Sequence, residues 1–294
     1  YHNALKHYAK PVANAVGMLA DKIIENKGKK IVLVSLARAG IPIGILVKRY
    51  IKFKYGINVP HYSISIIRGR GIDDNAMKYL LEKYRPQQIL FVDGWIGKGA
   101  ILNELKKDIS AYEGVSADIA VVADPANVTE LCGTHEDILI PSSCLNSTVS
   151  GLISRTFLRD DIIGRDDFHG AVYYGELTDS DLSYDFIETI EKEFNMENTP
   201  DLEKRVESQG IDEVINIGKN FGIDDINLIK PGIGETTRVL LRRIPWKVLI
   251  DERYKGNPQL EHIVRLAEEK HTPVEYYPLT HYKCCGIIKK LADA

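Results

Sequence analysis

The stretch "ILFVDGWIGKGAI", residues 89–101, combines a strand-like apolar run, a glycine-rich turn and the start of a helical pattern. The apolar run ends at Asp93, and the turn that follows contains three glycines and one lysine. Glycines let backbone N–H groups turn inward, and the N-terminus of the next helix adds partial positive charge. The stretch therefore predicts a strand–turn–helix unit with a turn suited to phosphate. A tight structural connection is the alternative.

Similar units recur on both sides of this stretch. Strand-like runs alternate with helical patterns, which is typical of a parallel α/β sheet. The runs are "IVLVSL" (31–36), "HYSISII" (61–67), "QILFVDG" (88–94), "ADIAVVAD" (117–124), "DILI" (137–140) and "GAVYY" (170–174). The segment 4–25 predicts one or two helices that pack on the sheet. We therefore expect residues 1–190 to form one parallel α/β domain.

The amino-acid composition of the chain changes after this domain. Residues 191–224 are polar, acidic and helix-prone, and we interpret them as a helical connector. Residues 225–294 then predict a small α-β-α domain. Its expected elements are a helix at 235–244, a strand at 246–251, a helix at 257–270, a strand at 273–277 and a helix at 282–294.

Composition narrows the class of protein. The 294 residues are 44% hydrophobic and 27% charged, with a net charge of −3, which is ordinary for a globular protein. No apolar run approaches the roughly 20 residues of a membrane-spanning helix, and no signal peptide is visible, although the chain begins with Tyr1 rather than Met. The four cysteines show no metal-type spacing, which favours free thiols and a cytoplasmic location.

Three loops follow consecutive strands of the predicted sheet: "SLARAGIPIG" (35–44), "IRGRGIDD" (67–74) and "DGWIGKGA" (93–100). The carboxyl ends of parallel strands meet at one edge, where ligands of open α/β sheets bind. We expect this edge to gather four cations that suit several phosphates. They are Arg38, Arg68, Arg70 and Lys98.

In order and spacing, these loops resemble those of the type I phosphoribosyltransferases. The resemblance implies a phosphoribosyltransferase that binds phosphoribosyl pyrophosphate with Mg²⁺ and moves the phosphoribosyl group to or from a base, without a membrane and as a possible homodimer. It assigns catalytic roles to Asp93, which also contacts Mg²⁺ indirectly, Arg68 and Arg70. The ligand-binding residues that it implies are Arg38, Ala39, Gly40, Gly94, Gly97, Lys98, Gly99 and Ala100.

The chain departs from that family in one loop. The family usually has two adjacent acidic residues and two threonines there, whereas this chain has only Asp93, and Gly97 and Ala100 replace the hydroxyls. Binding is therefore expected more firmly than turnover. A protein that senses a nucleotide without catalysis is the alternative.

The segment "PSSCLNSTVSGLISRTFL" (141–158) is rich in hydroxyl and amide side chains. As a helix N-terminus it would present polar groups that suit a base or sugar, and a plainly capped helix is the alternative. The groups are those of Ser142, Ser143, Asn146 and Ser147. With the loops above, this segment resembles the StiP family, which is associated with tellurite-resistance and stress operons.

The StiP family is also described as a cysteine protease, which supplies a competing enzyme hypothesis. Cys144 is then the candidate nucleophile, and His135 or His169 is its candidate base. A lone cysteine is more often a small core residue, so this activity is the less favoured one.

The C-terminal unit resembles the Pelota-type RNA-binding domains through "KPGIGETTRVLLRRIP" (230–245), "KVLIDERY" and "THYKCCGIIKKL". Residues 228–294 contain 12 Lys and Arg against 8 Asp and Glu, which fits an RNA partner, and ordinary charge scatter or a protein-docking surface is the alternative. The resemblance implies that the glycine-rich turn and its helix contact the RNA backbone. The residues concerned are Lys230, Gly232, Gly234, Glu235, Thr236, Thr237, Arg238, Arg242 and Arg243.

Overall fold

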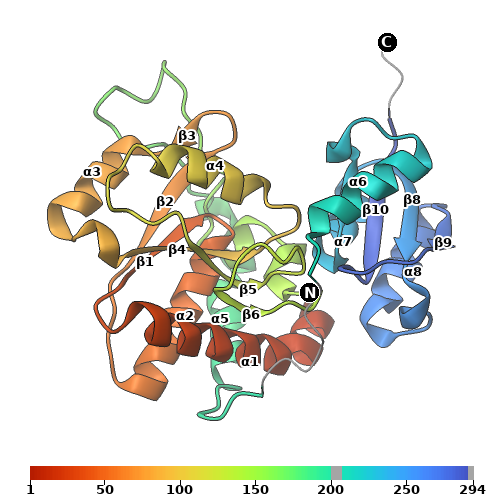
Figure 1. Ribbon diagram of the computed structural model, residues 1–294, viewed down its shortest axis with the longest axis horizontal. Helices are drawn as coiled ribbons and strands as arrows, with labels where there is room; N and C mark the ends of the chain where they lie inside the picture. The colour runs from red at the N-terminus through yellow and green to blue at the C-terminus, as the bar shows by residue number, and fades with distance from the viewer. Residues whose placement is uncertain (200–206, 291–294) are drawn as a thin grey trace.

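The computed structural model describes residues 1–199 and 207–290, and for Cys144 the backbone alone. These residues form two sheets that lie side by side (Figure 1). The first has six strands in the order β3-β2-β1-β4-β5-β6, and the second has four in the order β7-β10-β8-β9. The predicted fold class, a parallel α/β sheet followed by a small second unit, is confirmed.

The first sheet is parallel except for β3, which pairs antiparallel with β2. Its strands are β1 (Val32–Ala37), β2 (His61–Ile67), β3 (Gly71–Ile72), β4 (Ile89–Trp95), β5 (Ile119–Ala123) and β6 (Cys132–Thr134). The predicted strand at 137–140 is wrong, because Asp137 within it bonds to the second unit instead of to a sheet. The predicted strand at 170–174 is reduced to two isolated bridges.

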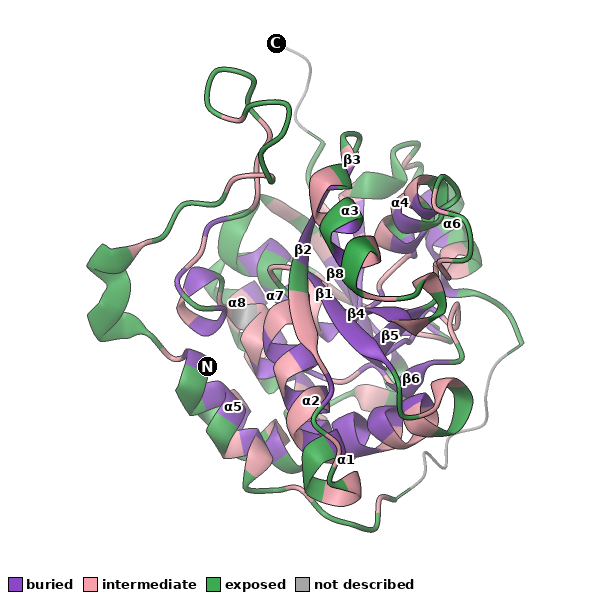
Figure 2. Cartoon of the chain, turned by 90° about the vertical axis from the view of Figure 1, so that its left-hand side faces the viewer, coloured by how far each residue is buried: buried purple, intermediate pink, exposed green. Residues whose placement is uncertain are grey.

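Helices cover both faces of this sheet, so its central strands are buried on both sides (Figure 2). One face carries α1 (His2–Lys27), α2 (Gly40–Tyr55) and α5 (Ser183–Glu191), and the other carries α3 (Asp74–Lys83) and α4 (Ala100–Ile109). The predicted first helix is a single helix that runs through Pro11. The helix predicted to begin in the segment 141–158 is wrong, because that segment holds two short 3-10 turns, Pro141–Cys144 and Ser147–Val149.

The second sheet also lies between helices. Its strands are β7 (Ile229–Pro231), β8 (Pro245–Ile250), β9 (Val274–Tyr276) and β10 (Cys284–Ile288). One face carries α7 (Ile233–Arg242) and α8 (Glu261–Glu269), and the other carries α6 (Gly210–Phe221).

The predicted helix at 282–294 is wrong over its described part. A run of consecutive fully buried residues suits a central strand, and β10 indeed lies between β7 and β8. Residues 291–294 of that predicted helix lie outside the described residues, as do residues 200–206 of the predicted connector. The predicted domain boundaries at 190 and 224 stay predictions.

The two units are joined by buried polar contacts. The carboxylate of Asp137 accepts hydrogen bonds from the backbone N–H groups of Ile233, at 3.0 Å, and Lys283, at 2.9 Å. The Tyr282 hydroxyl donates to the carbonyl oxygen of Gly97 at 2.5 Å. Within the described parts of the chain, none of the helices is both long and apolar enough to cross a membrane.

Candidate functional site

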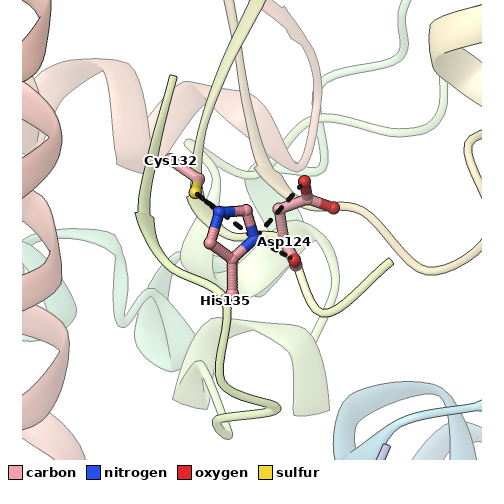
Figure 3. Close-up of side chains that lie close together, drawn as sticks. All are labelled: Asp124, Cys132 and His135. Atoms are coloured by element: carbon pink, nitrogen blue, oxygen red, sulfur yellow. Dashed lines mark hydrogen bonds and ion pairs between the residues drawn. The ribbon is translucent and has the colours of Figure 1, made fainter. Parts of the chain in front are cut away.

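A thiol, an imidazole and a carboxylate meet at the β6 edge of the first sheet (Figure 3). Cys132 Sγ lies 3.3 Å from Nε2 of His135. Nδ1 of His135 lies 2.9 Å from the carbonyl oxygen of Asp124 and 3.8 Å from its carboxylate Oδ2. Because a carbonyl oxygen only accepts, Nδ1 carries the proton in the neutral ring, and the Nε2 lone pair faces the thiol.

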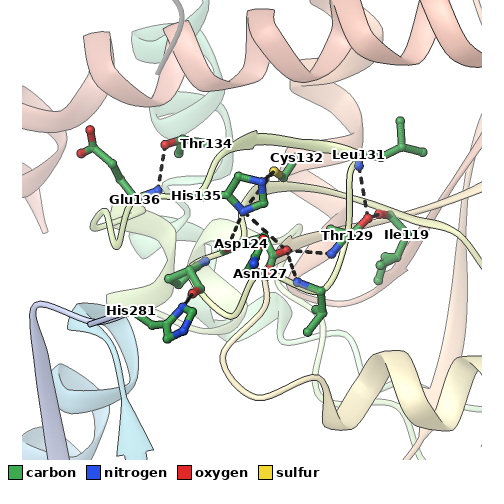
Figure 4. A network of polar contacts seen from close by, with 12 residues as sticks. Ile119, Asp124, Asn127, Thr129, Leu131, Cys132, Thr134, His135, Glu136 and His281 are labelled. Atoms are coloured by element: carbon green, nitrogen blue, oxygen red, sulfur yellow. Dashed lines mark hydrogen bonds and ion pairs between the residues drawn. The ribbon is translucent and has the colours of Figure 1, made fainter. Parts of the chain in front are cut away.

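The turn between β5 and β6 is built around the Asp124 carboxylate (Figure 4). Its Oδ2 accepts backbone N–H bonds from Val128, at 2.7 Å, and Thr129, at 2.8 Å. Its Oδ1 is buried and has no hydrogen-bond partner among the described atoms. Burial raises the pKa of Asp124, whereas the two N–H bonds lower it. The oxygen that accepts these two bonds, Oδ2, is also the one that lies 3.8 Å from Nδ1 of His135, so the carboxylate is placed to stabilise a cation that develops on the ring.

Helix α1 fixes the strand that carries Cys132. Lys22 Nζ donates to the carbonyl oxygen of Cys132 at 2.8 Å. A Cβ at Gly133 would lie 2.0 Å from the backbone oxygen of Ala15, so only glycine permits this close approach. Because β6 is held on that side, the Cys132 side chain points to the opposite face, where it joins the cluster under α3 and α4.

The second unit contacts the turn next to this pair. Cys132 and Asp124 are fully buried, and the side chain of His135 is 25% exposed. The turn at 125–127 follows Asp124 directly, and its Ala126 belongs to the same buried cluster as Cys132. The second unit holds this turn through the bond from Gly210 N to Ala126 O, at 2.9 Å, and the contact of His281 Nδ1 with Pro125 O, at 3.1 Å (Figure 4). Because Cys132 is fully buried, a reagent can reach its thiol only if the surrounding chain moves, and this turn is part of that surrounding chain.

The same three side chains offer ligand atoms that all lie within 4.8 Å of one another. A thiolate, an imidazole and a carboxylate suit Zn²⁺, whereas Mg²⁺ prefers oxygen ligands. The group can therefore act either as a nucleophile with its base or as a zinc site with an open coordination position.

The predicted basic loops lie at the other strand ends. Arg38 Nη1 donates to Ser147 Oγ at 2.8 Å and to the Ile153 carbonyl at 2.9 Å. Ala39 is exposed, and Gly40 packs closely on β4. Arg68 is exposed and donates to Asn227 of the second unit at 3.1 Å, and Arg70 is exposed.

The predicted glycine loop makes hydrogen bonds to the second unit. Lys98 Nζ donates to the carbonyl oxygens of Ile226, at 2.6 Å, and Ile229, at 2.9 Å. Burial, and then the charge of Lys230, lowers the pKa of Lys98 to about 8. Gly99 caps α4 with a positive φ, and Ala100 begins that helix.

Asp93, the predicted catalytic carboxylate, accepts a bond from the N–H of Gly94, its neighbour, at 2.7 Å. Burial raises the pKa of Asp93 to about 6. The Mg²⁺ ion and the homodimer expected from the sequence are not tested by these contacts and stay predictions.

The hydroxyl-rich segment lies against the second unit. Asn146 Oδ1 accepts from Arg242 at 2.8 Å, beside the contact of Ser147 with Arg38. Ser142 is half-buried, and Ser143 Oγ is buried with no partner among the described atoms. The side chain of Cys144 lies outside the described residues.

His169, the other predicted base, contacts Ser65 at 2.9 Å. Of the two candidate histidines, His135 is therefore the one that the structure describes beside a thiol, and that thiol belongs to Cys132.

The predicted RNA-binding residues divide into buried and exposed groups. Gly232, Thr236 and Thr237 are buried, and Lys230, Gly234 and Glu235 are half-buried. The exposed residues are Arg238, Arg242 and Arg243. The first turn of α7, predicted to face RNA phosphates, instead donates to Asp137. The exposed arginines are therefore the part of this set that an RNA can reach directly.

Comparison with known proteins assigns the family. Residues 1–191 match the family model described as "Tellurite-like stress resistance cysteine protease StiP". The chain belongs to the StiP family. Residues 208–290 match the model of the PELOTA RNA binding domain. A curated relative, the cysteine protease StiP of Acinetobacter baylyi, is 32% identical over 312 residues, which cover 99% of this chain and 80% of the relative.

The solved structures with a likeness to this StiP chain include phosphoribosyltransferases. A hypoxanthine-guanine phosphoribosyltransferase of Bacillus anthracis aligns with a TM-score of 0.31 and 18% identity, over 42% of this chain and 71% of that one. The enzyme of Leishmania tarentolae in complex with GMP aligns with a TM-score of 0.32 and 15% identity, over 45% and 75%. TM-scores this low say nothing about activity.

The predicted function, phosphoribosyl transfer with nucleotide sensing as its alternative, is wrong. Both the StiP family model and the curated relative carry the description of a cysteine protease. The structure supplies a physical reason, because Lys98 and the Gly97 carbonyl are engaged by the second unit at the loop that was expected to hold the ribose-phosphate.

The Cys132–His135 pair was missed because Cys132 begins a strand, β6, that the sequence does not reveal, and His135 directly follows that strand. The available signal was a histidine three positions after a cysteine, following a buried run that ends in aspartate.

Proposed function

We propose that this StiP protein is a cysteine-dependent peptidase with Cys132 as the nucleophile and His135 as its base. The observation that carries the proposal is the 3.3 Å contact between Sγ and Nε2. Asp124 is a positioning residue, because its carbonyl oxygen fixes the tautomer and orientation of the ring. The description of the family and of the curated relative as cysteine proteases supports this choice.

The chemistry follows from this arrangement. His135 Nε2 takes the thiol proton of Cys132, and the thiolate attacks the carbonyl carbon of a peptide bond. The C–N bond then breaks as the imidazolium returns the proton to the leaving amine. A water molecule then gives a proton to Nε2 and attacks the carbonyl carbon of the thioester. The C–S bond breaks, and the imidazolium returns the proton to the thiolate, which restores the thiol. The buried carboxylate of Asp124, 3.8 Å from Nδ1, stabilises the imidazolium in both steps.

A thiol-reactivity experiment tests the pair without a known substrate. The rate of iodoacetamide reaction at each cysteine is measured by peptide mass spectrometry between pH 5 and pH 9. An ordinary thiol reacts slowly at pH 6 because little thiolate is present, whereas a thiolate–imidazolium pair reacts readily. We expect His135→Ala to lower the Cys132 rate at pH 6 by at least about tenfold. Cys284, whose pKa burial raises, is the internal control.

A hydrolysis assay completes the test. Fluorescent casein is incubated with the wild type, Cys132→Ala and the matched control Cys284→Ala. We expect loss of hydrolysis only in Cys132→Ala. Hydrolysis that survives in Cys132→Ala contradicts the assignment, as does stoichiometric zinc together with hydrolysis that a zinc chelator abolishes, because the cluster would then be a metal centre.

We also propose a second function, RNA binding by residues 208–290. The match to the PELOTA domain model supports it, together with the exposed arginines of α7. We expect the full chain to retard a structured RNA in a gel at low salt, and Arg238→Ala/Arg242→Ala to weaken this binding. The matched control is Lys270→Ala/Lys289→Ala, two exposed cations outside α7. Equal binding by both double variants contradicts this function.

A further inference from the structure

Arginines from both units meet where α7 faces the first sheet. Arg38 donates to Ser147, and Arg242 of α7 donates to the adjacent residue Asn146, each at 2.8 Å. Consecutive residues of one segment thus hold guanidinium groups from two units. We call Arg38, Arg155, Arg238 and Arg242 the junction arginines.

The junction arginines form a concentration of positive charge. Burial, and then the charges of the other three arginines, lowers the pKa of Arg38 below its ordinary value. Glu235 pairs with Arg238 at 3.1 Å. Among the described residues, neither Arg38 nor Arg155 has a carboxylate within ion-pair distance. Like charges that lie close together repel one another, and an anion bound between them would relieve that repulsion.

Polar groups beside the junction arginines also favour a ligand. Ser143 Oγ is buried without a partner among the described atoms, and it lies 3.2 Å from the Cβ position of Gly234, one turn before Arg238 on α7. Arg155 and Arg238 are exposed, and Arg38 is half-buried. Solvent-borne phosphates can therefore reach guanidinium groups on both sides of the junction.

We propose that the junction arginines bind the phosphodiester backbone of RNA, so that an RNA held by α7 also contacts the first unit through Arg38 and Arg155. This inference rests on the proposed RNA binding. An RNA backbone presents successive phosphates. Arg238 and Arg242 lie four residues apart on α7, and the exposed Arg243 follows them, so several phosphates in a row could each contact an arginine. A small nucleotide shares the phosphate chemistry, and the experiment separates the two sources.

The test uses the full chain and a fluorescein-labelled RNA hairpin with an internal bulge, followed by fluorescence anisotropy from 50 to 300 mM salt. The variants are Arg38→Ala/Arg155→Ala and Arg238→Ala/Arg242→Ala. The matched control is Arg159→Ala/Arg165→Ala, two exposed arginines elsewhere in the first unit. Arg155→Ala alone is included because no described contact gives that side chain a structural role, so the fold is expected to tolerate its loss.

For two lost phosphate contacts we expect Arg38→Ala/Arg155→Ala to bind about tenfold more weakly at low salt and the slope of log K against log salt to fall by about 1.4–1.8 in magnitude. Arg155→Ala alone should give about half of that slope change, and the control should bind as the wild type does.

Wild-type affinity in Arg38→Ala/Arg155→Ala, together with weakened binding in Arg238→Ala/Arg242→Ala, overturns the inference and leaves RNA binding by α7 standing. Failure of the wild type to bind the hairpin overturns both. Titration with ADP is the last arm: binding of ADP that Arg155→Ala abolishes, without hairpin binding, would assign the site to a small nucleotide instead.

Discussion

The contact between His281 and Pro125 should control access to Cys132. Because Pro125 O only accepts, Nδ1 of His281 donates to it, and Nε2 accepts from Ser208 Oγ at 2.9 Å. His281→Ala removes the one hydrogen bond that this ring makes to the turn. A hydrogen bond of this kind contributes about 0.5–1.5 kcal/mol, which corresponds to a change of roughly 3- to 12-fold in the opening equilibrium of the turn.

A buried thiol is alkylated only from the open state, so its rate follows that equilibrium. We expect iodoacetamide to modify Cys132 several-fold faster in His281→Ala than in the wild type, with the rate read at the Cys132 peptide. Ser208→Ala is the matched control, because it removes the other partner of the ring and leaves the bond to Pro125 in place. It should change the rate by less than about twofold.

Two results would refute this reasoning. An unchanged Cys132 rate in a folded His281→Ala variant would mean that the turn does not limit access. An equal acceleration at Cys284 and Cys285, both fully buried in the second unit, would mean that the whole chain had loosened. The free energy of unfolding in urea, measured for the wild type and for each variant, separates that general loosening from a local opening.

Two further predictions concern stability. Asp137→Ala leaves the buried N–H groups of Ile233 and Lys283 without an acceptor, so we expect urea unfolding to show a loss of about 2–5 kcal/mol. A loss no larger than that of the exposed control Asp161→Ala would contradict this. Burial lowers the pKa of His61 to about 4, so the unfolded state takes up a proton between pH 6.5 and pH 4 that the folded state does not. Stability should therefore fall by roughly 2 kcal/mol as the pH drops to 4.5, and His61→Gln should lack this fall; an identical pH dependence in both would contradict it.

The parallel sheet was predictable because its central strands are buried on both faces. β1 and β4 consist almost entirely of buried residues, so they read in the sequence as continuous apolar runs between helical patterns. Strand β6 gives no such signal, since "CGT" contains no apolar run. Its position depends on the approach of Gly133 to Ala15, more than 110 residues away in the chain, which no local pattern encodes.

The same limit applies to the candidate site. His135 was identified as a possible base, but its thiol partner was sought at Cys144, because Cys144 was expected near a helix N-terminus. The grouping of the strand-end cations around one phosphate site stays a prediction. What the sequence did not show is that Lys98, expected to bind a phosphate, donates hydrogen bonds to the carbonyl oxygens of Ile226 and Ile229.

The position of the second unit connects the two proposed activities. Gly210 and His281 hold the turn at 125–127, while Arg238 and Arg242 of the same unit face the first sheet at the junction. Between these two regions, Asp137 of the first unit accepts buried hydrogen bonds from Ile233, in the first turn of α7, and from Lys283, the residue before β10. A movement of the second unit large enough to free the turn would therefore stretch the junction as well, and an RNA that bridges the junction would oppose that movement.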